Sequence, residues 1–287
     1  MSETPARGDL EWGTIPGLLT SSAARFGVAP AIIDGEKTVT FTELAAQTEV
    51  AARAYIAAGI EPGDRVGLWA PNLWEWIPAA LGAQAAGAVL VPLNTRYKGV
   101  EAEYILRRSG AKVLVTMGEF LGIDYAGMLE AASGDAGPGA RTLREVVTLR
   151  TDDARSWDAF LERGQAIDAS QARARAAALA PTDLSDMLFT SGTTGNPKGV
   201  MQTHAATLRA FRSWSEVVGL READRYLVVN PFFHAFGYKA GWLACLMQGA
   251  TVFPQTVFEV DDVLGRIERV RISVMPGPPT LSPSILN

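Results

Sequence analysis

Short apolar segments alternate with longer amphipathic or alanine-rich segments along most of the chain. One helix is expected to begin after Thr40, because Thr40 and Glu43 have the spacing of a capping box, and to end at Gly59, ahead of a Pro-Gly pair. The pattern then predicts strands at 65–70, 88–93, 112–116, 146–149, 186–190, 199–202, 226–229, 251–253 and 272–275. Helices are predicted at 74–86, 100–109, 124–133, 168–178, 205–218, 237–247 and 260–269.

This alternation predicts an α/β fold, with parallel or mixed sheets covered by helices on both faces. With 287 residues, of which 48% are hydrophobic, the chain has enough apolar material for a large core or two subdomains. We expect a first α/β subdomain over residues 1–180 and a second over residues 181–287. The glycine-rich residues 134–139 predict a surface loop.

The densest chemistry lies in LFTSGTTGNPKG at residues 188–199, between two predicted strands. Its glycines let backbone amides converge on an anion, and its hydroxyl groups and Lys198 add further donors. A polyphosphate is the ligand that these donors fit best, whereas a solvated hairpin turn would not need so many donors beside a lysine. The segment is not a Walker A loop, because Pro197 stands at the second glycine position and Gly199 follows the lysine.

A second cluster, NPFFHAFGYKAG at residues 230–241, places aromatic residues around a histidine at the end of a predicted strand. These residues could form part of the core or the wall of a ligand pocket. His204 begins a predicted helix, and we expect it to cap or pack, not to catalyse. The single cysteine, Cys245, lies in an apolar stretch and is expected to be a buried structural thiol.

Charge and hydropathy argue against several classes of protein. The balance of 26 basic against 31 acidic residues disfavours a nucleic-acid partner. Acidic residues precede any apolar run at the N-terminus, unlike in a signal peptide. The uncharged residues 77–95 are interrupted by Pro78 and Pro92, so they predict a buried helix and strand and no membrane span. We therefore expect a cytoplasmic enzyme.

The segment at 188–199 resembles the signature of the adenylate-forming (AMP-binding) superfamily in its acyl-CoA synthetase branch. The segments VTFTELAAQTEVAARAYIAAGIEPGDRVGLWAPN at 39–72, GAVLVPLNTRY at 87–97, NPFFHAFGYKAG at 230–241 and VMPGPPT at 274–280 fit the same family. The resemblance runs from about residue 15 to about residue 281. It implies the fold of an incomplete N-terminal large domain of an adenylate-forming enzyme.

The resemblance implies a two-step reaction of a small-molecule carboxylic acid. The carboxylate attacks the α-phosphorus of ATP to give an acyl-adenylate, and the acyl group then passes to coenzyme A; Mg²⁺ is implied beside ATP. The implied ATP-binding residues are Thr190, Ser191, Gly192, Thr193, Thr194, Gly195, Asn196, Pro197 and Lys198. The implied catalytic residues are Thr194, Lys198 and His234. The implied acid pocket consists of Phe233, His234, Phe236, Gly237, Tyr238 and Gly277.

The residues around His234 limit the range of acids that we expect as substrates. They are bulky and neutral, and they lack the aspartate with which amino-acid-activating relatives pair an α-ammonium. The same segments, with LWAPNLWEW and VPLNTRY, resemble most a ligase of actinobacterial steroid catabolism, which activates the propanoate side chain of a bicyclic ring remnant. Medium-chain fatty acids and aromatic acids are the alternatives.

Complete members of this family are nearly twice as long as the chain. Beyond the matching segments they carry a Thr-Glu segment that holds the metal, an aspartate for the ribose, a hinge and a small C-terminal domain with a lysine. We expect these parts to be absent here, and the metal ligands with them. The alternative to an active ligase is therefore a truncated, non-catalytic fragment that binds polyphosphate weakly.

Overall fold

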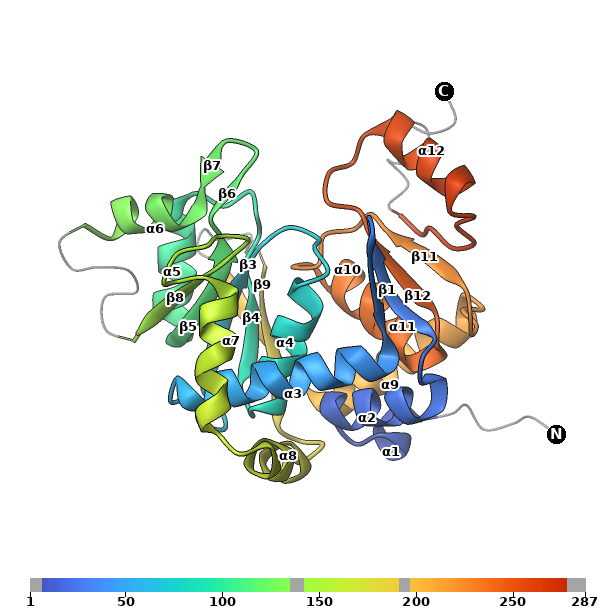
Figure 1. Ribbon diagram of the computed structural model, residues 1–287, viewed down its shortest axis with the longest axis horizontal. Helices are drawn as coiled ribbons and strands as arrows, with labels where there is room; N and C mark the ends of the chain where they lie inside the picture. The colour runs from blue at the N-terminus through green and yellow to red at the C-terminus, as the bar shows by residue number, and fades with distance from the viewer. Residues whose placement is uncertain (1–6, 135–141, 191–196, 278–287) are drawn as a thin grey trace.

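Two β-sheets lie side by side in the structure, a computed structural model that describes residues 7–134, 142–190 and 197–277 (Figure 1). One sheet has the strand order β10-β9-β4-β3-β5-β8 and the other the order β11-β12-β1-β2. The strands are β1 (Pro30–Asp34), β2 (Lys37–Thr40), β3 (Arg65–Trp69), β4 (Val89–Pro92), β5 (Ala111–Met117), β8 (Glu145–Leu149), β9 (Leu184–Thr190), β10 (Lys198–Thr203), β11 (Arg225–Val228) and β12 (Thr251–Pro254). A small hairpin pairs β6 (Glu119–Phe120) with β7 (Ile123–Asp124).

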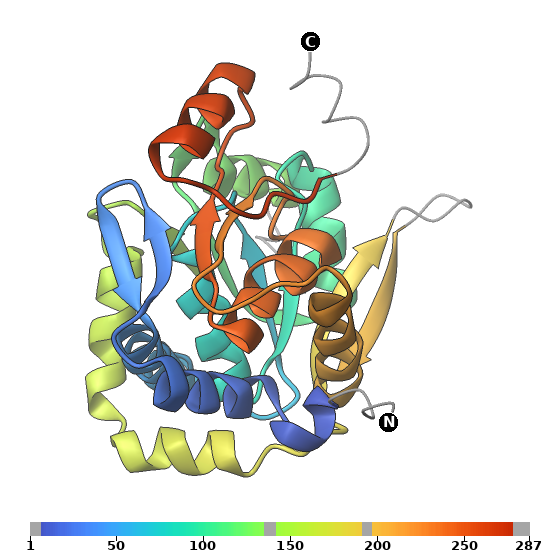
Figure 2. The same ribbon diagram turned by 90° about the vertical axis from the view of Figure 1, so that its right-hand side faces the viewer.

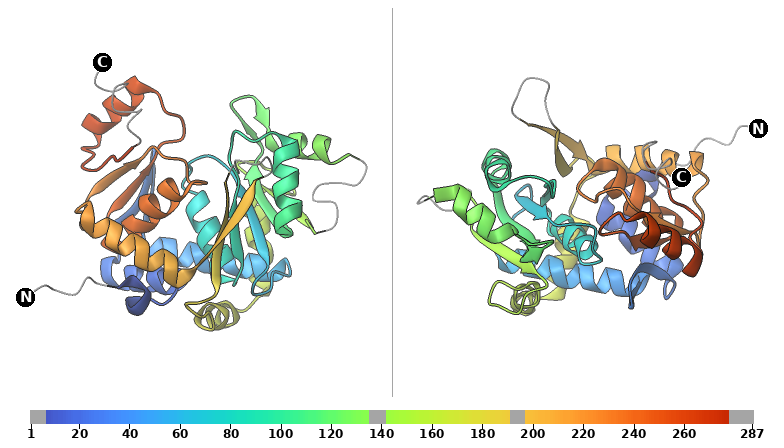
Figure 3. Two further views of the ribbon diagram at one scale, coloured as in Figure 1. Left: turned by 180° about the vertical axis from the view of Figure 1, so that it is seen from behind. Right: turned by 90° about the horizontal axis from the view of Figure 1, so that it is seen from above.

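Helices cover both sheets, and α3 runs beneath the two of them (Figures 1 and 3). The helices are α1 (Gly8–Glu11), α2 (Ile15–Phe26), α3 (Phe41–Ala57), α4 (Trp76–Ala85), α5 (Gly99–Ser109), α6 (Tyr125–Ser133), α7 (Trp157–Arg163), η2 (Gly164–Ala166), α8 (Ala169–Ala177), α9 (His204–Val217), α10 (Ala235–Gly237), η3 (Tyr238–Leu243), α11 (Ala244–Gln248) and α12 (Val260–Arg269). The predicted capping box of α3 is confirmed, because the Thr40 side chain accepts from the Glu43 amide and the Glu43 carboxylate accepts from the Thr40 amide.

The predicted α/β class is confirmed, and the sheets are mixed. Strands β9, β4, β3, β5 and β8 run parallel to one another, as do β11, β12 and β1. The hairpins β1–β2 and β9–β10 add antiparallel edges. The predicted strand at 272–275 is reduced to a single bridge between Tyr226 and Val274. Most of the predicted loop at 134–139 lies outside the described residues.

The two sheets do not divide at residue 180, where we expected the subdomain boundary. Strand β9, which follows that position, pairs with β4 in the first sheet through Leu90 and Asp186. Strand β1, from the beginning of the chain, pairs with β12 through Ile32 and Val252. Each sheet therefore contains strands from both sides of residue 180 or from both ends of the chain, because strand pairing depends on which strands the fold brings together and not on their order in the sequence.

Buried aromatic side chains fill the space between the two sheets. Trp76, at the start of α4, contacts the rings of Phe232, Tyr238 and Trp242 with centroid distances of 5.6, 5.9 and 5.9 Å. All four side chains are buried. Helix α4 and strand β4 are buried as predicted for residues 77–95, and no helix in the described ranges is long and apolar enough to cross a membrane. The packing of Trp76 against these three rings holds the two sheets in a fixed relation.

Candidate active site

A cavity of about 1140 Å³ lies where strands of both sheets end. Its walls are the segments that follow β3, β4, β5, β11 and β12 at their carboxyl ends. The lining residues are Pro71, Asn72, Thr95, Arg96, Tyr97, Lys98, Phe120, Leu121, Ile123, Tyr125, Met128, Val229, Asn230, Pro231, Phe233, Gln255, Thr256, Val257 and Phe258. In open α/β sheets, ligands bind at this edge of the strands. The wall is largely aromatic and apolar, with the exposed cations Arg96 and Lys98 on one side.

The predicted phosphate loop begins and ends at the same edge of the first sheet. Because β9 runs parallel to β4, the end of β9 at Thr190 lies toward the carboxyl end of β4. Thr190 pairs with Lys198 at the start of β10, and both residues are exposed. Figure 2 shows β9 and β10 projecting from the rest of the molecule. The predicted residues 191–196 lie outside the described part of the chain.

A strand follows the predicted phosphate loop directly, as the apolar residues after Lys198 predict. Thr190 and Lys198 lie opposite one another on the two strands, and their hydroxyl and ammonium groups are donors of the kind that suits phosphate oxygens. Pro197 is half-buried beside them. These described residues fit a polyphosphate ligand.

His234 caps the short helix α10 beside the second sheet. Its Nδ1 accepts a hydrogen bond from the Phe236 amide at 3.2 Å, and the residue is exposed. With Nδ1 as the acceptor, the neutral imidazole carries its proton on Nε2. Phe233, one residue earlier, lines the large cavity, and Phe236 packs edge-on against Trp214.

Gly237 and Tyr238 differ in position from the predicted acid pocket. A Cβ atom on Gly237 would lie 2.2 Å from the carbonyl oxygen of Pro231, so this glycine admits neighbouring backbone and leaves no open space. Tyr238 has no exposed surface, stacks on Trp242 at 4.9 Å, and its hydroxyl accepts from Gln84 Nε2 at 2.7 Å. Tyr238 is therefore a core residue here. Gly277 is exposed at the end of the described chain.

Asn72, which the sequence reasoning did not single out, joins the two sides of the cavity. Its side-chain amide donates to the carbonyl oxygens of Val228 (3.1 Å) and Asn230 (2.9 Å). Its side-chain oxygen accepts from the Phe232 amide at 2.7 Å, and its backbone carbonyl accepts from the hydroxyl of Thr256 at 2.9 Å. Asn72 follows β3 in the first sheet, so it fixes the segment of the second sheet that leads to His234. Only its position after a predicted strand could have indicated this role.

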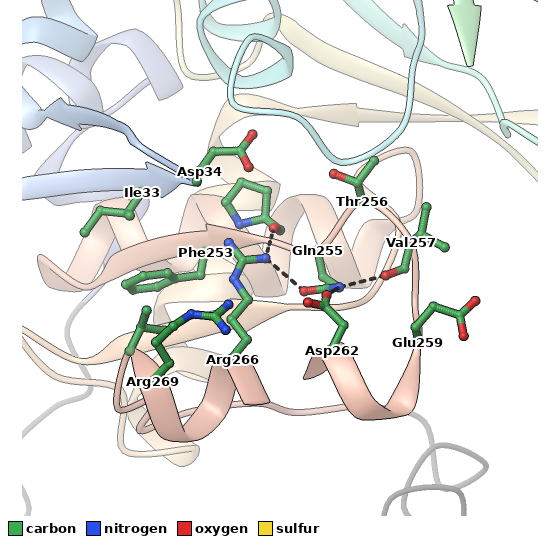
Figure 4. A pocket seen from close by; sticks show the side chains of 13 residues that line it. Ile33, Asp34, Phe253, Gln255, Thr256, Val257, Glu259, Asp262, Arg266 and Arg269 are labelled. Carbon is green, nitrogen blue, oxygen red and sulfur yellow. Dashed lines mark hydrogen bonds between the residues drawn. The ribbon is translucent and has the colours of Figure 1, made fainter. Parts of the chain in front are cut away.

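A smaller cavity of about 550 Å³ lies on the other side of the segment 255–257 (Figure 4). Arg266, on α12, donates to Pro254 O at 2.6 Å and to Gln255 Oε1 at 2.8 Å. The amide of Gln255 in turn donates to Val257 O and to the Asp262 carboxylate, both at 2.7 Å. Since these polar groups satisfy one another, we interpret this side as support for the wall of the larger cavity.

His204 and Cys245 have the packing roles that we expected. The side chain of His204 is buried, and its Nδ1 accepts from the Ile15 amide at 3.2 Å. Burial lowers the pKa of His204 to about 4, despite the opposing effect of Asp183. Cys245 is a buried free thiol, and burial raises its pKa. Neither residue lines the large cavity.

Within residues 7–134, 142–190 and 197–277, no group of three or more His, Cys, Asp or Glu side chains could hold a metal ion. Where Mg²⁺ enters with ATP, the phosphate oxygens themselves supply part of its coordination.

The structure is thus an α/β fold of two mixed sheets, with a large cavity at the carboxyl ends of their parallel strands. The sequence profile of the family "AMP-binding enzyme" matches residues 19–287. The chain belongs to this family.

Two similar proteins are named 3-[(3aS,4S,7aS)-7a-methyl-1,5-dioxo-octahydro-1H-inden-4-yl]propanoyl:CoA ligase. The one from Mycobacterium tuberculosis is 48% identical over 96% of this chain and 53% of its own length. The one from Rhodococcus jostii is 43% identical over 96% of this chain and 54% of its own length. The chain thus spans about half the length of the curated relatives it matches.

Solved structures agree with this assignment. The N-terminal domain of FACL13 from Mycobacterium tuberculosis superposes with a TM-score of 0.80 at 27% identity, over 95% of this chain and 64% of that one. The o-succinylbenzoate CoA synthetase (MenE) of Bacillus subtilis, solved with the acyl-adenylate OSB-AMP, gives a TM-score of 0.71 at 25% identity, over 94% and 63%. The expected adenylate-forming fold is confirmed.

Proposed function

We propose that the natural polypeptide containing this chain is an AMP-forming acyl-CoA ligase. In this proposal the chain supplies two parts of the active site: a phosphate hairpin, formed by β9, β10 and the segment that joins them, and an acid cleft, which is the large cavity described above. The observation that carries the proposal is a convergence at one edge of the structure. The end of β9, the start of β10, the segment leading to His234 and the large cavity all lie at the carboxyl ends of the parallel strands.

In the first step, a carboxylate oxygen of the acid bonds to the α-phosphorus of ATP, and the bond from that phosphorus to pyrophosphate breaks. Negative charge accumulates on the departing pyrophosphate, so fixed donors around it lower the barrier. We assign this task to the backbone amides and hydroxyl groups of residues 190–196 and to the ammonium of Lys198. In the second step, the thiolate of coenzyme A attacks the acyl carbon, a thioester forms and AMP departs.

We assign His234 to the carboxylate of the acid. Its Nδ1 is engaged by the Phe236 amide, so Nε2–H is the group left to donate. A hydrogen-bond donor at this point orients the carboxylate, whose oxygen remains free to attack the phosphorus. Phe233 and Phe258 then form part of the aromatic wall against which the rest of the acid packs.

For the acid itself we propose a bicyclic propanoate of the kind named in the two ligases described above. A wide cavity of about 1140 Å³ with aromatic walls suits a rigid fused-ring acid better than a narrow tunnel would. Medium-chain and aromatic acids are the alternatives to test. ATP and coenzyme A are the other substrates, and we place the reaction in the cytoplasm, where both are abundant.

Titration of this chain with ATP and with tripolyphosphate, followed by calorimetry, tests the phosphate hairpin. Lys198→Ala and Thr194→Val are expected to weaken binding, and to slow adenylation by the natural polypeptide on the order of 100-fold. The matched control is Lys37→Ala, which removes an exposed lysine from β2. Adenylation at the normal rate in both hairpin variants would refute the assignment. If this chain binds tripolyphosphate as tightly as ATP and supports no adenylation, it acts alone only as a polyphosphate-binding fragment.

A further inference from the structure

The ammonium group of Lys239 lies in the interior between the two sheets. Lys239 is on η3 and Asp186 is on β9, and neither side chain has any exposed surface. The Lys239 ammonium lies 2.8 Å from a carboxylate oxygen of Asp186. It also donates to Gln202 Oε1 and, at 3.1 Å, to the hydroxyl of Thr207. All three ammonium hydrogens thus have acceptors, which come from β9, β10 and α9.

Two of these acceptors form the base of the phosphate hairpin. Asp186 and Gln202 are directly opposite one another in the β9–β10 pair. Further along the same strands, Thr190 pairs with Lys198 where the hairpin closes. The rise of a strand places that closing pair about 13 Å along the hairpin from the Asp186–Gln202 pair. A cation that binds both strands at their base fixes the direction in which the closing pair projects.

The segment that carries Lys239 is itself rigidly held. It follows α10 directly, and α10 is capped by His234. Gly237 packs against neighbouring backbone, and a Cβ atom on Gly241 would lie 2.9 Å from the Val228 side chain. Lys239 therefore links η3, which follows His234 and α10, to the base of the β9–β10 hairpin.

Stability alone does not explain a charge pair at this depth. The desolvation of two charges costs about as much as their attraction returns, so apolar residues of similar volume often serve stability equally well. Burial lowers the pKa of Lys239, and the Asp186 carboxylate opposes that shift. A directional contact with three partners, by contrast, defines a geometry that apolar packing does not.

We propose that Lys239 is a positioning residue, which sets the phosphate hairpin relative to the His234 segment and thereby determines the affinity of the site for polyphosphate. The inference rests on the proposed function of the hairpin. The informative variant is Lys239→Met combined with Asp186→Asn, which removes both charges and nearly keeps the volume of both side chains. The hydrogen bond from the Thr207 hydroxyl to Gln202 Oε1 then remains, as does the hydrogen bond from the Ser185 hydroxyl to Gln202 O. The control is Arg150→Gln, which breaks the ion pair with Glu75 at the start of α4.

Three quantities are measured on this chain: the melting temperature, the affinity for tripolyphosphate, and amide hydrogen exchange at Phe189, Gly199 and Leu68. We expect the double variant to melt within about 5 °C of the parent. It should bind tripolyphosphate at least about tenfold more weakly, and exchange at Phe189 and Gly199 should accelerate about tenfold while Leu68 in β3 is unchanged. The control should bind as the parent does. A purely structural role would change the melting temperature and leave affinity unchanged once stability is restored.

Parental affinity and parental exchange in a stable double variant would overturn the proposal. If the parent itself binds no tripolyphosphate, the phosphate assignment fails separately. Hydrogen exchange then tests the positioning role of Lys239: unchanged protection at Phe189 and Gly199 in the double variant overturns that role. If the double variant does not fold, Thr207→Val removes one acceptor and is read by the same criteria. Restoration of affinity by Thr207→Ser would support the proposal.

Discussion

The loss of the Asn72 side chain should release the segment that leads to His234. Asn72 makes three side-chain hydrogen bonds, to Val228 O, Asn230 O and the Phe232 amide, and is itself buried. At about 1 kcal/mol for each, Asn72→Ala should lower the free energy of unfolding by about 3 kcal/mol. For a chain of 287 residues this corresponds to a melting temperature lower by about 5 °C.

Asn72→Asp nearly keeps the volume of the side chain and keeps the acceptor oxygen, but it replaces the donor amide with a second oxygen. Its carboxylate can still accept from the Phe232 amide, but it faces the two carbonyl oxygens that Asn72 Nδ2 contacts. The pKa of the introduced carboxyl should therefore rise in the folded state. A raised folded pKa means that stability is retained below the unfolded pKa of about 4 and is lost as the pH rises above it. The variant should thus be closer to the parent at pH 5 than at pH 8.

The assay combines thermal melting with hydrogen exchange at the Phe232 amide, which should accelerate in Asn72→Ala. The control is Asn94→Ala, since Asn94 accepts a single side-chain hydrogen bond from the Arg96 amide within its own turn. It should cost less than about 1 kcal/mol. Equal effects of the two alanine variants, or an unchanged Phe232 exchange rate, would refute the role of Asn72 as a link between the sheets.

Three further predictions concern packing and ionisation. Gly237→Ala places a methyl group 2.2 Å from Pro231 O and should cost more than about 3 kcal/mol in chemical denaturation, whereas Gly265→Ala in α12 meets no atom within 4 Å and should be neutral or stabilising. The pKa of His204 is lowered to about 4, so its neutral form should contribute about 3 kcal/mol above pH 6.5, which is lost as the pH falls from 6.5 toward 4. His204→Gln should flatten that part of the stability profile, and a parent histidine that titrates near 6.5 by NMR would contradict the reasoning. Cys245 has no exposed surface, so a thiol reagent should label it only on unfolding; rapid labelling of the native protein would disprove this.

Local sequence patterns predicted the elements that local interactions define. The capping box at Thr40 and Glu43 located the start of α3, and the apolar residues after Lys198 indicated a strand and no helix. Strands β1 and β2 were not predicted, because β1 is held by pairing with β12, more than two hundred residues later. Such a contact leaves no periodic pattern in the short segment itself.

The candidate site shows the same division between local and distant effects. Thr190, Lys198 and His234 were predicted from their motifs, and their elements lie at the edge that parallel strands predict. The cavity walls at 95–98 and 255–258 come together only through the arrangement of the sheets. Tyr238 was assigned to the pocket because it adjoins the histidine motif, but the helical turn there directs its ring into the core against Trp242. Neighbours in sequence on a helix point in different directions, so the motif alone could not distinguish the two positions.

The most direct test of the account is acid-dependent exchange of pyrophosphate into ATP, measured on the natural polypeptide that contains this chain. The acids to compare are a methyl-dioxo-octahydroindenyl propanoate, octanoate and benzoate. We predict exchange with the bicyclic propanoate at the highest kcat/KM, and a loss on the order of 100-fold in Lys198→Ala. Absence of exchange with every acid, or exchange that Lys198→Ala leaves unchanged, would contradict the assignment of this cleft and hairpin to acid activation.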